Sequence, residues 1–234
     1  MRLGSEASDI ATGANLHSGI RTLANVGLIL KICIALFGVT ALVSGLTPLV
    51  AFSMDNAAPG PLMMTLMVAS GVASLIQFFA FLVGGALLIV WVHQAYANLE
   101  KAQLPGLKRS AGWAAGSFFV PLINLVVPMR VMREIYNRSK GENEFDADAD
   151  VALVTGWWVC ALAAILVLTA IFAIFLIEVL PGLFVTMPMM GFAGLVFMEY
   201  LFALGSAFFL FRVVHKVTAA QRELRHVVHA EVFS

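Results

Sequence analysis

Ionisable side chains inside otherwise apolar stretches are the first candidates for chemistry in this sequence. Lys31 and Glu199 each lie within a long apolar run, and a charge at the centre of a bilayer costs about 3 kcal/mol on insertion scales. Lys31 lies near one end of its run, so its ammonium group can reach the membrane surface. Glu199 lies deeper, 13 residues before Arg212. It is the candidate for a proton or cation site, and a neutral, hydrogen-bonded carboxylic acid is the alternative.

The spacing of acids and histidines argues against a metal site. Residues 146–150 begin like a calcium-binding loop, but Val151 and Trp157 occupy the positions where such a loop needs Gly and Glu. His226 and His229 lie three residues apart, without a third ligand near them in the sequence. The sequence also lacks a phosphate-binding loop, a paired-histidine zinc motif and a serine-nucleophile motif. We therefore expect no catalytic residue, no metal, no cofactor and no enzymatic activity.

The composition indicates the class of protein. Of 234 residues, 61% are apolar and 12% are charged, whereas a soluble domain carries about 25% charged residues. The formal net charge of zero excludes a nucleic-acid binder built on positive charge, and only two cysteines, Cys33 and Cys160, exclude a disulfide scaffold. We predict an all-α, polytopic membrane protein. Its first partner is the lipid bilayer, and we expect it to bind no nucleic acid.

Four runs are long and apolar enough to cross a hydrocarbon core, which needs about 20 residues of helix. The predicted spans are residues 24–52, 63–91, 151–180 and 189–211. Continuous apolar runs without alternation indicate helices and not barrel strands. The predicted organisation is an N-terminal tail at 1–23, a single membrane domain at 24–211 with a long connection at 92–150, and a C-terminal helix at 212–234.

The lysines and arginines predict the orientation. All but Lys31 of the 14 basic residues lie outside the four runs, in the two tails and in the connection at 92–150. With an even number of spans these segments share one compartment, which the positive-inside rule makes the cytoplasm. We therefore expect a multi-pass protein of the cell inner (plasma) membrane with both termini cytoplasmic.

A fifth apolar stretch at residues 110–129 tests this count. Pro121 and Pro128 interrupt it, and each proline removes a donor from a helical ladder. If this stretch crossed the membrane, the basic residues before and after it would face opposite compartments, against the positive-inside rule. We predict a re-entrant or interfacial segment, whose broken backbone protein or water must cover.

A cytoplasmic amphipathic helix is predicted after Pro128. Its apolar residues share one face and its polar residues the other: Val131, Met132, Ile135 and Tyr136 against Arg130, Arg133, Glu134 and Asn137. Glu134 and Arg138 form a favourable pair one turn apart. We expect this helix to lie along the inner leaflet with its polar face toward water.

The C-terminal tail carries apolar residues at helical spacing. They are Val213, Val217, Ala220, Leu224 and Val227. Two heptads fall short of a coiled coil, so we expect the fourth span to continue as a helix that packs on the rest of the protein.

Three stretches of the sequence resemble a known family. They are WVHQAYANLEKA from Trp91, GWAAGSFFVPLINLVVPMRVMREIYNRS at 112–139, and the pair Trp157-Trp158. They resemble a bacterial family of multi-pass membrane proteins known as domain of unknown function four-three-two-eight. Its hallmark is a tryptophan shortly before Phe-x-Pro-x-x-Asn-Leu-x-x-Pro, followed by a helix with a Glu. Here those places hold Trp113, Phe119, Pro121, Asn124, Leu125, Pro128 and Glu134. The resemblance implies an architecture and no activity.

Asn124 is the sharpest single candidate within this motif. It lies between two prolines, whose missing N–H groups leave backbone carbonyls without partners, and its amide can donate twice and accept twice. It can tie the interrupted backbone together, which we favour, or face a ligand.

These observations lead to two hypotheses of function. The first is a non-enzymatic interaction or structural module that binds a partner protein or lipid at its cytoplasmic face, the partner being a membrane protein or a second copy of the chain. The alternative is a small transporter or channel for an ion or small solute that uses Glu199.

Overall fold

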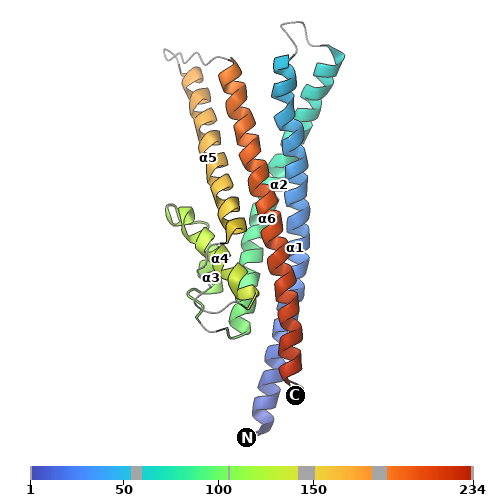
Figure 1. The fold of residues 1–234 in the computed structure, drawn as a ribbon, viewed down its shortest axis with the longest axis vertical. Helices are drawn as coiled ribbons and strands as arrows, with labels where there is room; N and C mark the ends of the chain where they lie inside the picture. The colour runs from blue at the N-terminus through green and yellow to red at the C-terminus, as the bar shows by residue number, and fades with distance from the viewer. Residues whose placement is uncertain (1, 54–59, 105, 142–150, 181–188, 233–234) are drawn as a thin grey trace. The chain divides into compact units, whose positions relative to one another are not determined.

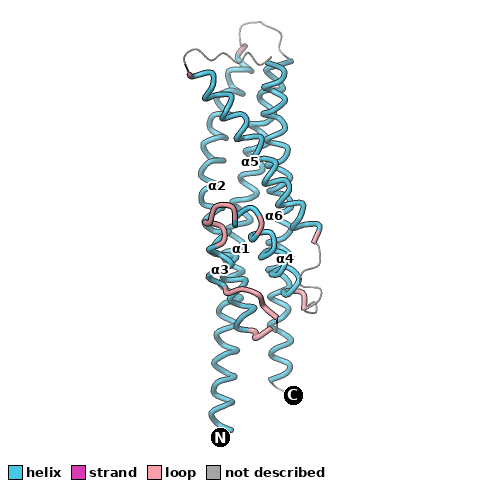
Figure 2. Tube along the Cα trace, turned by 90° about the vertical axis from the view of Figure 1, so that its left-hand side faces the viewer, coloured by secondary structure: helices cyan, strands magenta, loops and turns pink. Residues whose placement is uncertain are grey.

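The computed structural model describes residues 2–53, 60–104, 106–141, 151–180 and 189–232. These residues are almost entirely helical and contain no strand (Figure 2). The elements, labelled in Figure 1, are α1 (Arg2–Ser53), α2 (Pro61–Lys101), α3 (Ala111–Gly116), the 3-10 turn η1 (Ile123–Leu125), α4 (Val127–Ser139), α5 (Ala152–Val179) and α6 (Met189–Val232). The run at residues 146–150, discussed above as a failed calcium-loop match, lies outside the described residues.

Four of these helices confirm the predicted multi-pass architecture. The helices α1, α2, α5 and α6 are each long and apolar enough to cross a membrane. Three of them are much longer than a bilayer requires, with 52 residues in α1, 41 in α2 and 44 in α6. At 1.5 Å per residue they exceed the roughly 30 Å hydrocarbon core. Each therefore continues as a helix beyond its apolar part, as predicted for the fourth span.

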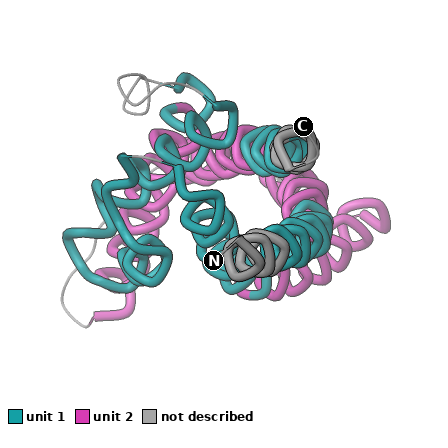
Figure 3. The backbone as a smooth tube through the Cα atoms, turned by 90° about the horizontal axis from the view of Figure 1, so that it is seen from below, with its two compact units in different colours: residues 1–32, 83–155, 211–234 teal, residues 33–82, 156–210 magenta. Residues whose placement is uncertain are grey.

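The chain divides into two compact units, coloured in Figure 3. Unit 1 comprises residues 1–32, 83–155 and 211–234, and unit 2 comprises residues 33–82 and 156–210. The predicted proline-broken segment belongs entirely to unit 1. The predicted division into two tails and one membrane domain stays a prediction.

Unit 2 consists of the apolar parts of the four long helices. Ser44 Oγ of α1 lies 3.3 Å from Ser74 Oγ of α2. Gly45 lies against Tyr200, and Gly156 lies against Phe209, so that a Cβ added to either glycine would be 3.0 Å from the aromatic ring. Many large apolar side chains of these helices are exposed. Helices that are apolar on every side are typical of segments surrounded by lipid.

Unit 1 packs the ends of α1, α2 and α6 closely together. A Cβ added to Gly19 would collide with Asn98 Oδ1, and one added to Gly27 would lie 3.1 Å from both Trp91 Nε1 and Thr218 Oγ1. The Trp91 indole donates a hydrogen bond to Thr218 Oγ1 at 3.3 Å. The two glycines thus provide the space in which buried polar side chains of α2 and α6 meet α1.

Helix α4 differs from the prediction in one respect. It starts at Val127 with Pro128 in its first turn, as expected, and the predicted apolar face is buried. Arg130 is exposed, as expected for the polar face. Two other residues of that face are buried, because Glu134 is 2% and Asn137 1% exposed. The expectation of a water-facing polar side was therefore wrong at these residues.

Candidate functional site

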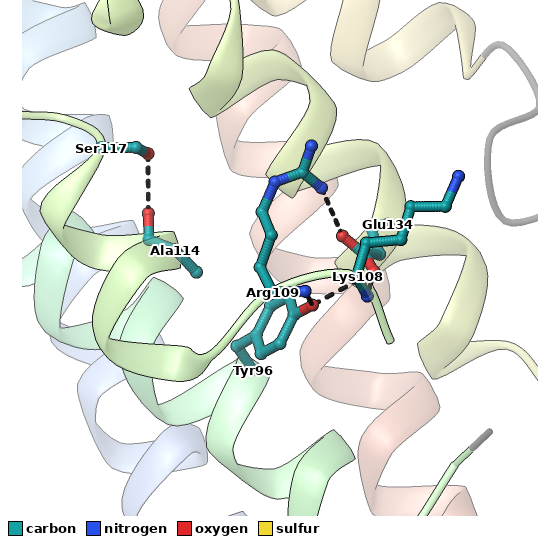
Figure 4. Close-up of polar contacts among 6 residues, drawn as sticks. All are labelled: Tyr96, Lys108, Arg109, Ala114, Ser117 and Glu134. Carbon is teal, nitrogen blue, oxygen red and sulfur yellow. Dashed lines mark hydrogen bonds and ion pairs between the residues drawn. The ribbon is translucent and has the colours of Figure 1, made fainter. Parts of the chain in front are cut away.

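The predicted motif begins with a short, well-capped helix. Ser110 precedes α3 and its Oγ accepts a hydrogen bond from the Trp113 backbone N–H at 3.3 Å. Glu100 Oε1 of α2 accepts from the Ala111 N–H at 2.9 Å. At the other end, Ser117 Oγ is buried and donates to the Ala114 carbonyl at 2.9 Å (Figure 4). Both ends of α3 are thereby fixed, although a helix of six residues is too short to be stable alone.

The backbone after α3 contains a tight turn with an unusual conformation. Leu122 has φ 65° and ψ −45°, a region that side-chain-bearing residues rarely adopt. The Ile123 N–H donates to the Pro121 carbonyl at 2.8 Å, which closes a three-residue turn around Leu122. Such a conformation costs of order 1–3 kcal/mol and persists only where the surrounding structure enforces it.

The same segment presents a set of exposed apolar side chains, which we call the motif face. Leu122 is 80% exposed and Phe119 is 69% exposed. The other members are also exposed: Trp113, Leu125 and Val126. Exposed apolar residues that gather in one segment mark surfaces for other proteins or for membranes.

Asn124 lies in η1 and is half-buried. Its backbone N–H donates to the Val120 carbonyl at 2.9 Å. Its side-chain amide has no hydrogen bond to any part of the chain that the structure describes. The backbone of Asn124, and not its side-chain amide, therefore helps to close the interrupted segment within the described residues.

Glu134 organises the buried polar cluster beneath the motif (Figure 4). Its Oε1 accepts from the Tyr96 hydroxyl at 3.1 Å and from the Lys108 backbone N–H at 2.8 Å. Its Oε2 forms an ion pair with Arg109 Nη1 at 2.7 Å. The Arg109 N–H in turn donates to the Tyr96 hydroxyl oxygen at 2.9 Å. Glu134 thus joins α4 to α2 and to the loop that leads into α3.

Arg138, the expected ion-pair partner of Glu134, does not take that place. Both carboxylate oxygens of Glu134 bind groups from other segments. Arg138 is buried, and its Nε and Nη2 have no hydrogen-bond partner within the described residues. The loop residue Arg109 has replaced the local helical pair.

A second buried hub connects α2, α4 and α6. Gln221 is 1% exposed, and its Nε2 donates to the Ala95 carbonyl and to Ser139 Oγ, both at 3.0 Å. Its Oε1 accepts from Asn98 Nδ2 at 3.0 Å. Both Nε2 donors and the Oε1 acceptor of this buried amide are thus bonded, so Gln221 fixes the end of α4 to the long helices.

The intramembrane candidates lie in different units. Lys31 is half-buried in the part of α1 that belongs to unit 1, and Glu199 is half-buried in the part of α6 that belongs to unit 2. Neither side chain has an ion pair or hydrogen bond within the described parts of the chain.

The described residues contain no group of three or more His, Cys, Asp or Glu side chains that could hold a metal ion. The side chains of His226 and His229 lie outside the described residues, as does the run at 146–150. The expected absence of a metal or cofactor therefore stays a prediction.

These features define a class: an all-helical, multi-pass membrane protein with a capped, proline-broken segment held on a buried polar cluster. A family model described as "Domain of unknown function (DUF4328)" matches residues 63–219, and the chain belongs to this family. No curated protein and no solved structure matches the chain.

Proposed function

We propose that the protein is a non-enzymatic interaction or structural module that binds a partner protein or lipid at its cytoplasmic face. The observation that carries this proposal is Leu122, which is 80% exposed in a strained turn. Among the described residues, such a side chain is left largely uncovered by the rest of the protein. Strained backbone of this kind clusters at binding and switching sites.

The cluster beneath the motif supports this role. Glu134, Arg109 and Tyr96 fix the loop before α3, and Ser110 and Glu100 cap the helix itself. A surface that is already ordered loses little conformational entropy when a partner binds. The motif face is therefore suited to recognition, while the buried residues serve to position it.

The cytoplasmic placement in the plasma (inner) membrane rests on charge. The basic residues outside the apolar runs occupy the two tails and the connection between α2 and α5, and such residues are retained on the cytoplasmic side. The close packing of Gly27 in α1 with Thr218 in α6 agrees with both tails lying on one side. The motif belongs to the same connection.

Site-specific photocrosslinking tests the proposal. Phe119 is replaced by its photoreactive benzoyl derivative in cells, and adducts are identified by mass. We expect a discrete protein adduct, or adducts with one enriched class of phospholipid. The matched control is Phe172 in α5, which is 57% exposed. Because Phe172 lies in an apolar helix that faces lipid, it should crosslink to the bulk lipids in proportion to their abundance, without enrichment of one class.

The variant Asn124→Ala provides a second test of the same crosslinking experiment. We expect it to reduce the Phe119 adduct strongly while the unfolding temperature in detergent stays unchanged, because the Asn124 amide makes no bond within the described chain. A Phe119 adduct pattern identical to that of Phe172, unaffected by Asn124→Ala, would contradict the proposal.

A small transporter or channel for an ion or small solute is the second candidate, and Glu199 favours it. This carboxyl group is half-buried in an apolar helix and has no bonded partner among the described residues. Flux into liposomes that contain the purified protein should fall in Glu199→Gln and persist in the control Glu178→Gln. Identical flux in the wild type and Glu199→Gln would remove this candidate.

A further inference from the structure

The motif face belongs to a stretch of the chain that carries no charged side chain. Residues 110–129 contain no Asp, Glu, Lys or Arg. The members of the motif face are nevertheless exposed, up to 80% at Leu122. Apolar side chains that stay exposed gain free energy when they leave water for apolar surroundings. The motif face therefore favours an apolar neighbour.

The backbone of the same stretch is also suited to apolar surroundings. Several of its N–H groups donate hydrogen bonds to carbonyls within the stretch: those of Phe118, Phe119, Ile123, Asn124, Leu125 and Val126. Pro121 and Pro128 have no N–H group to satisfy. A backbone donor without a partner is costly in lipid. The interrupted helix thus meets these donors without help from water.

A contact of α4 indicates the level of the motif relative to a membrane. Arg133 Nη2 of α4 donates a hydrogen bond to Thr155 Oγ1 of α5 at 3.0 Å. Thr155 is the fifth residue of the apolar run at 151–180, about 6 Å from its start along a helix. Because α4 directly follows the motif, the C-terminal end of the motif lies near the start of this run.

The helix before the motif indicates the same level. The Tyr96 hydroxyl of α2 accepts a hydrogen bond at 2.9 Å from the N–H of Arg109, the residue before the uncharged stretch. Tyr96 is five residues beyond the apolar run at 63–91, about 8 Å along a helix. The headgroup layer on one side of a bilayer is about 5–8 Å thick. Both ends of the motif are therefore held close to this layer.

We propose that the motif face inserts shallowly into the membrane, with its side chains at the boundary between the headgroups and the acyl chains of phospholipids. Tryptophan, here Trp113, and large apolar side chains are typical of that boundary. Of the two depths predicted from the sequence, re-entrant and interfacial, this is the interfacial one. The inference deepens the proposed function by naming phospholipid as the partner, and it rests on that function for the cytoplasmic side of the motif.

Depth-dependent fluorescence quenching tests the insertion. The full chain with Cys33→Ala and Cys160→Ala carries Leu122→Cys or Phe119→Cys, labelled with the environment-sensitive fluorophore NBD. It is reconstituted into nanodiscs of phosphatidylcholine and phosphatidylglycerol. A nitroxide is placed on the acyl chain of the phosphatidylcholine, either near the headgroup or near the terminal methyl group. We expect both labels to be quenched at least twofold more strongly by the nitroxide near the headgroup.

Two control positions calibrate the depth. Arg222→Cys replaces an exposed residue of α6 beyond the apolar run, and its label should be quenched weakly by either nitroxide. Leu166→Cys replaces a 71% exposed residue in the middle of the apolar run at 151–180. Its label should be quenched more strongly by the nitroxide near the terminal methyl group.

Three results would overturn the insertion. A Leu122→Cys label that behaves like the Arg222→Cys label would place the motif face in water. One that behaves like the Leu166→Cys label would place it deep in the hydrocarbon core. Labels at both motif positions that emit as in apolar surroundings, but are quenched by neither nitroxide, would assign the face to a second copy of the chain.

The inference and the proposed function fail separately, because the nanodiscs contain only this chain and lipid. A water-exposed Leu122→Cys label together with a discrete protein adduct of Phe119 in cells would overturn the insertion and leave the proposed function standing. Quenching near the headgroup together with a Phe119 adduct pattern identical to that of Phe172 would support the insertion and contradict selective recognition.

Discussion

Glu134 shows how one side chain can hold a whole segment in place, here the loop that leads into α3. Its carboxylate receives hydrogen bonds from a tyrosine of α2, a loop N–H and the Arg109 guanidinium, all from residues at least 25 positions away in the sequence. The side chain is almost fully buried. A buried acceptor with this many partners cannot be removed without leaving several donors unsatisfied.

Glu134→Ala should therefore lower the free energy of unfolding by about 3 kcal/mol, since it leaves Arg109 as an unpaired charge in a largely buried setting. Thermal unfolding of the protein in detergent measures this loss. The matched control is Glu178→Ala, at an exposed acid of α5, for which we expect a change below about 0.5 kcal/mol. Equal effects of the two substitutions would show that the cluster does not stabilise the fold.

Leu122 offers the opposite case, a residue whose replacement should stabilise the protein. Leu122→Gly relieves a backbone conformation that costs about 1–3 kcal/mol with a side chain, and the added chain entropy of glycine offsets about 0.5–1 kcal/mol of that gain. We expect the free energy of unfolding in detergent to rise by up to about 2 kcal/mol. The Phe119 adduct should weaken at the same time. A variant that loses both stability and adduct would contradict the assignment of Leu122 to recognition.

Among the elements, the long helices approach one another where glycine allows it. Gly19 of α1 faces Asn98 of α2 so closely that a methyl group has no space, whereas Gly13, two turns earlier in the same helix, has nothing within 4 Å. The two positions have the same residue type in the same helix. They differ only in what lies opposite them.

Gly19→Ala should cost about 2 kcal/mol of stability, because the added methyl group overfills the contact and displaces the buried Asn98 amide, which donates a hydrogen bond to Gln221. Gly13→Ala should stabilise by about 0.5–1 kcal/mol, because alanine favours a helix interior. Both effects are read from unfolding in the same detergent. If Gly19→Ala stabilised as much as Gly13→Ala, the close approach of α1 and α2 would be refuted.

The elements were largely predictable from the sequence, and the reason is physical. A helix that crosses lipid must be a long apolar run, so local composition predicts the four spans. It also predicts the interruptions at Pro121 and Pro128. The burial of the polar side of α4 was not predictable in this way. Amphipathic periodicity identifies two faces of a helix, but it does not reveal which groups lie opposite each face. Here the Glu134 carboxylate meets Tyr96 and Arg109, which come from other segments.

The members of the polar clusters escaped sequence reasoning for the same reason. Tyr96, Arg109 and Gln221 are common residue types in unremarkable local patterns. Their roles arise from partners far away in the sequence, such as the pairing of Gln221 with Asn98. The one local signal is the basic pair Lys108-Arg109 just before the motif, which indicates membrane orientation but does not by itself identify an ion pair.

At the scale of the whole molecule, the distribution of charge connects the architecture with the proposed function. The motif and both tails belong to the segments that hold 13 of the 14 lysines and arginines, and unit 2 is built from the apolar runs. An even number of spans gives the basic segments one compartment. In the proposed orientation, a partner of the motif face comes from the cytoplasm or from within the membrane.

Cysteine labelling in intact cells tests this placement most directly. In a background of Cys33→Ala and Cys160→Ala, the variants Arg130→Cys and Arg222→Cys are treated with a membrane-impermeant maleimide, with Gly60→Cys as the external control. We predict that Gly60→Cys reacts at once and that the other two react only after the cells are permeabilised. Reaction of Arg130→Cys in intact cells would place the segment after Pro128 outside, reaction of Arg222→Cys would place the C-terminal tail outside, and either result would contradict the account.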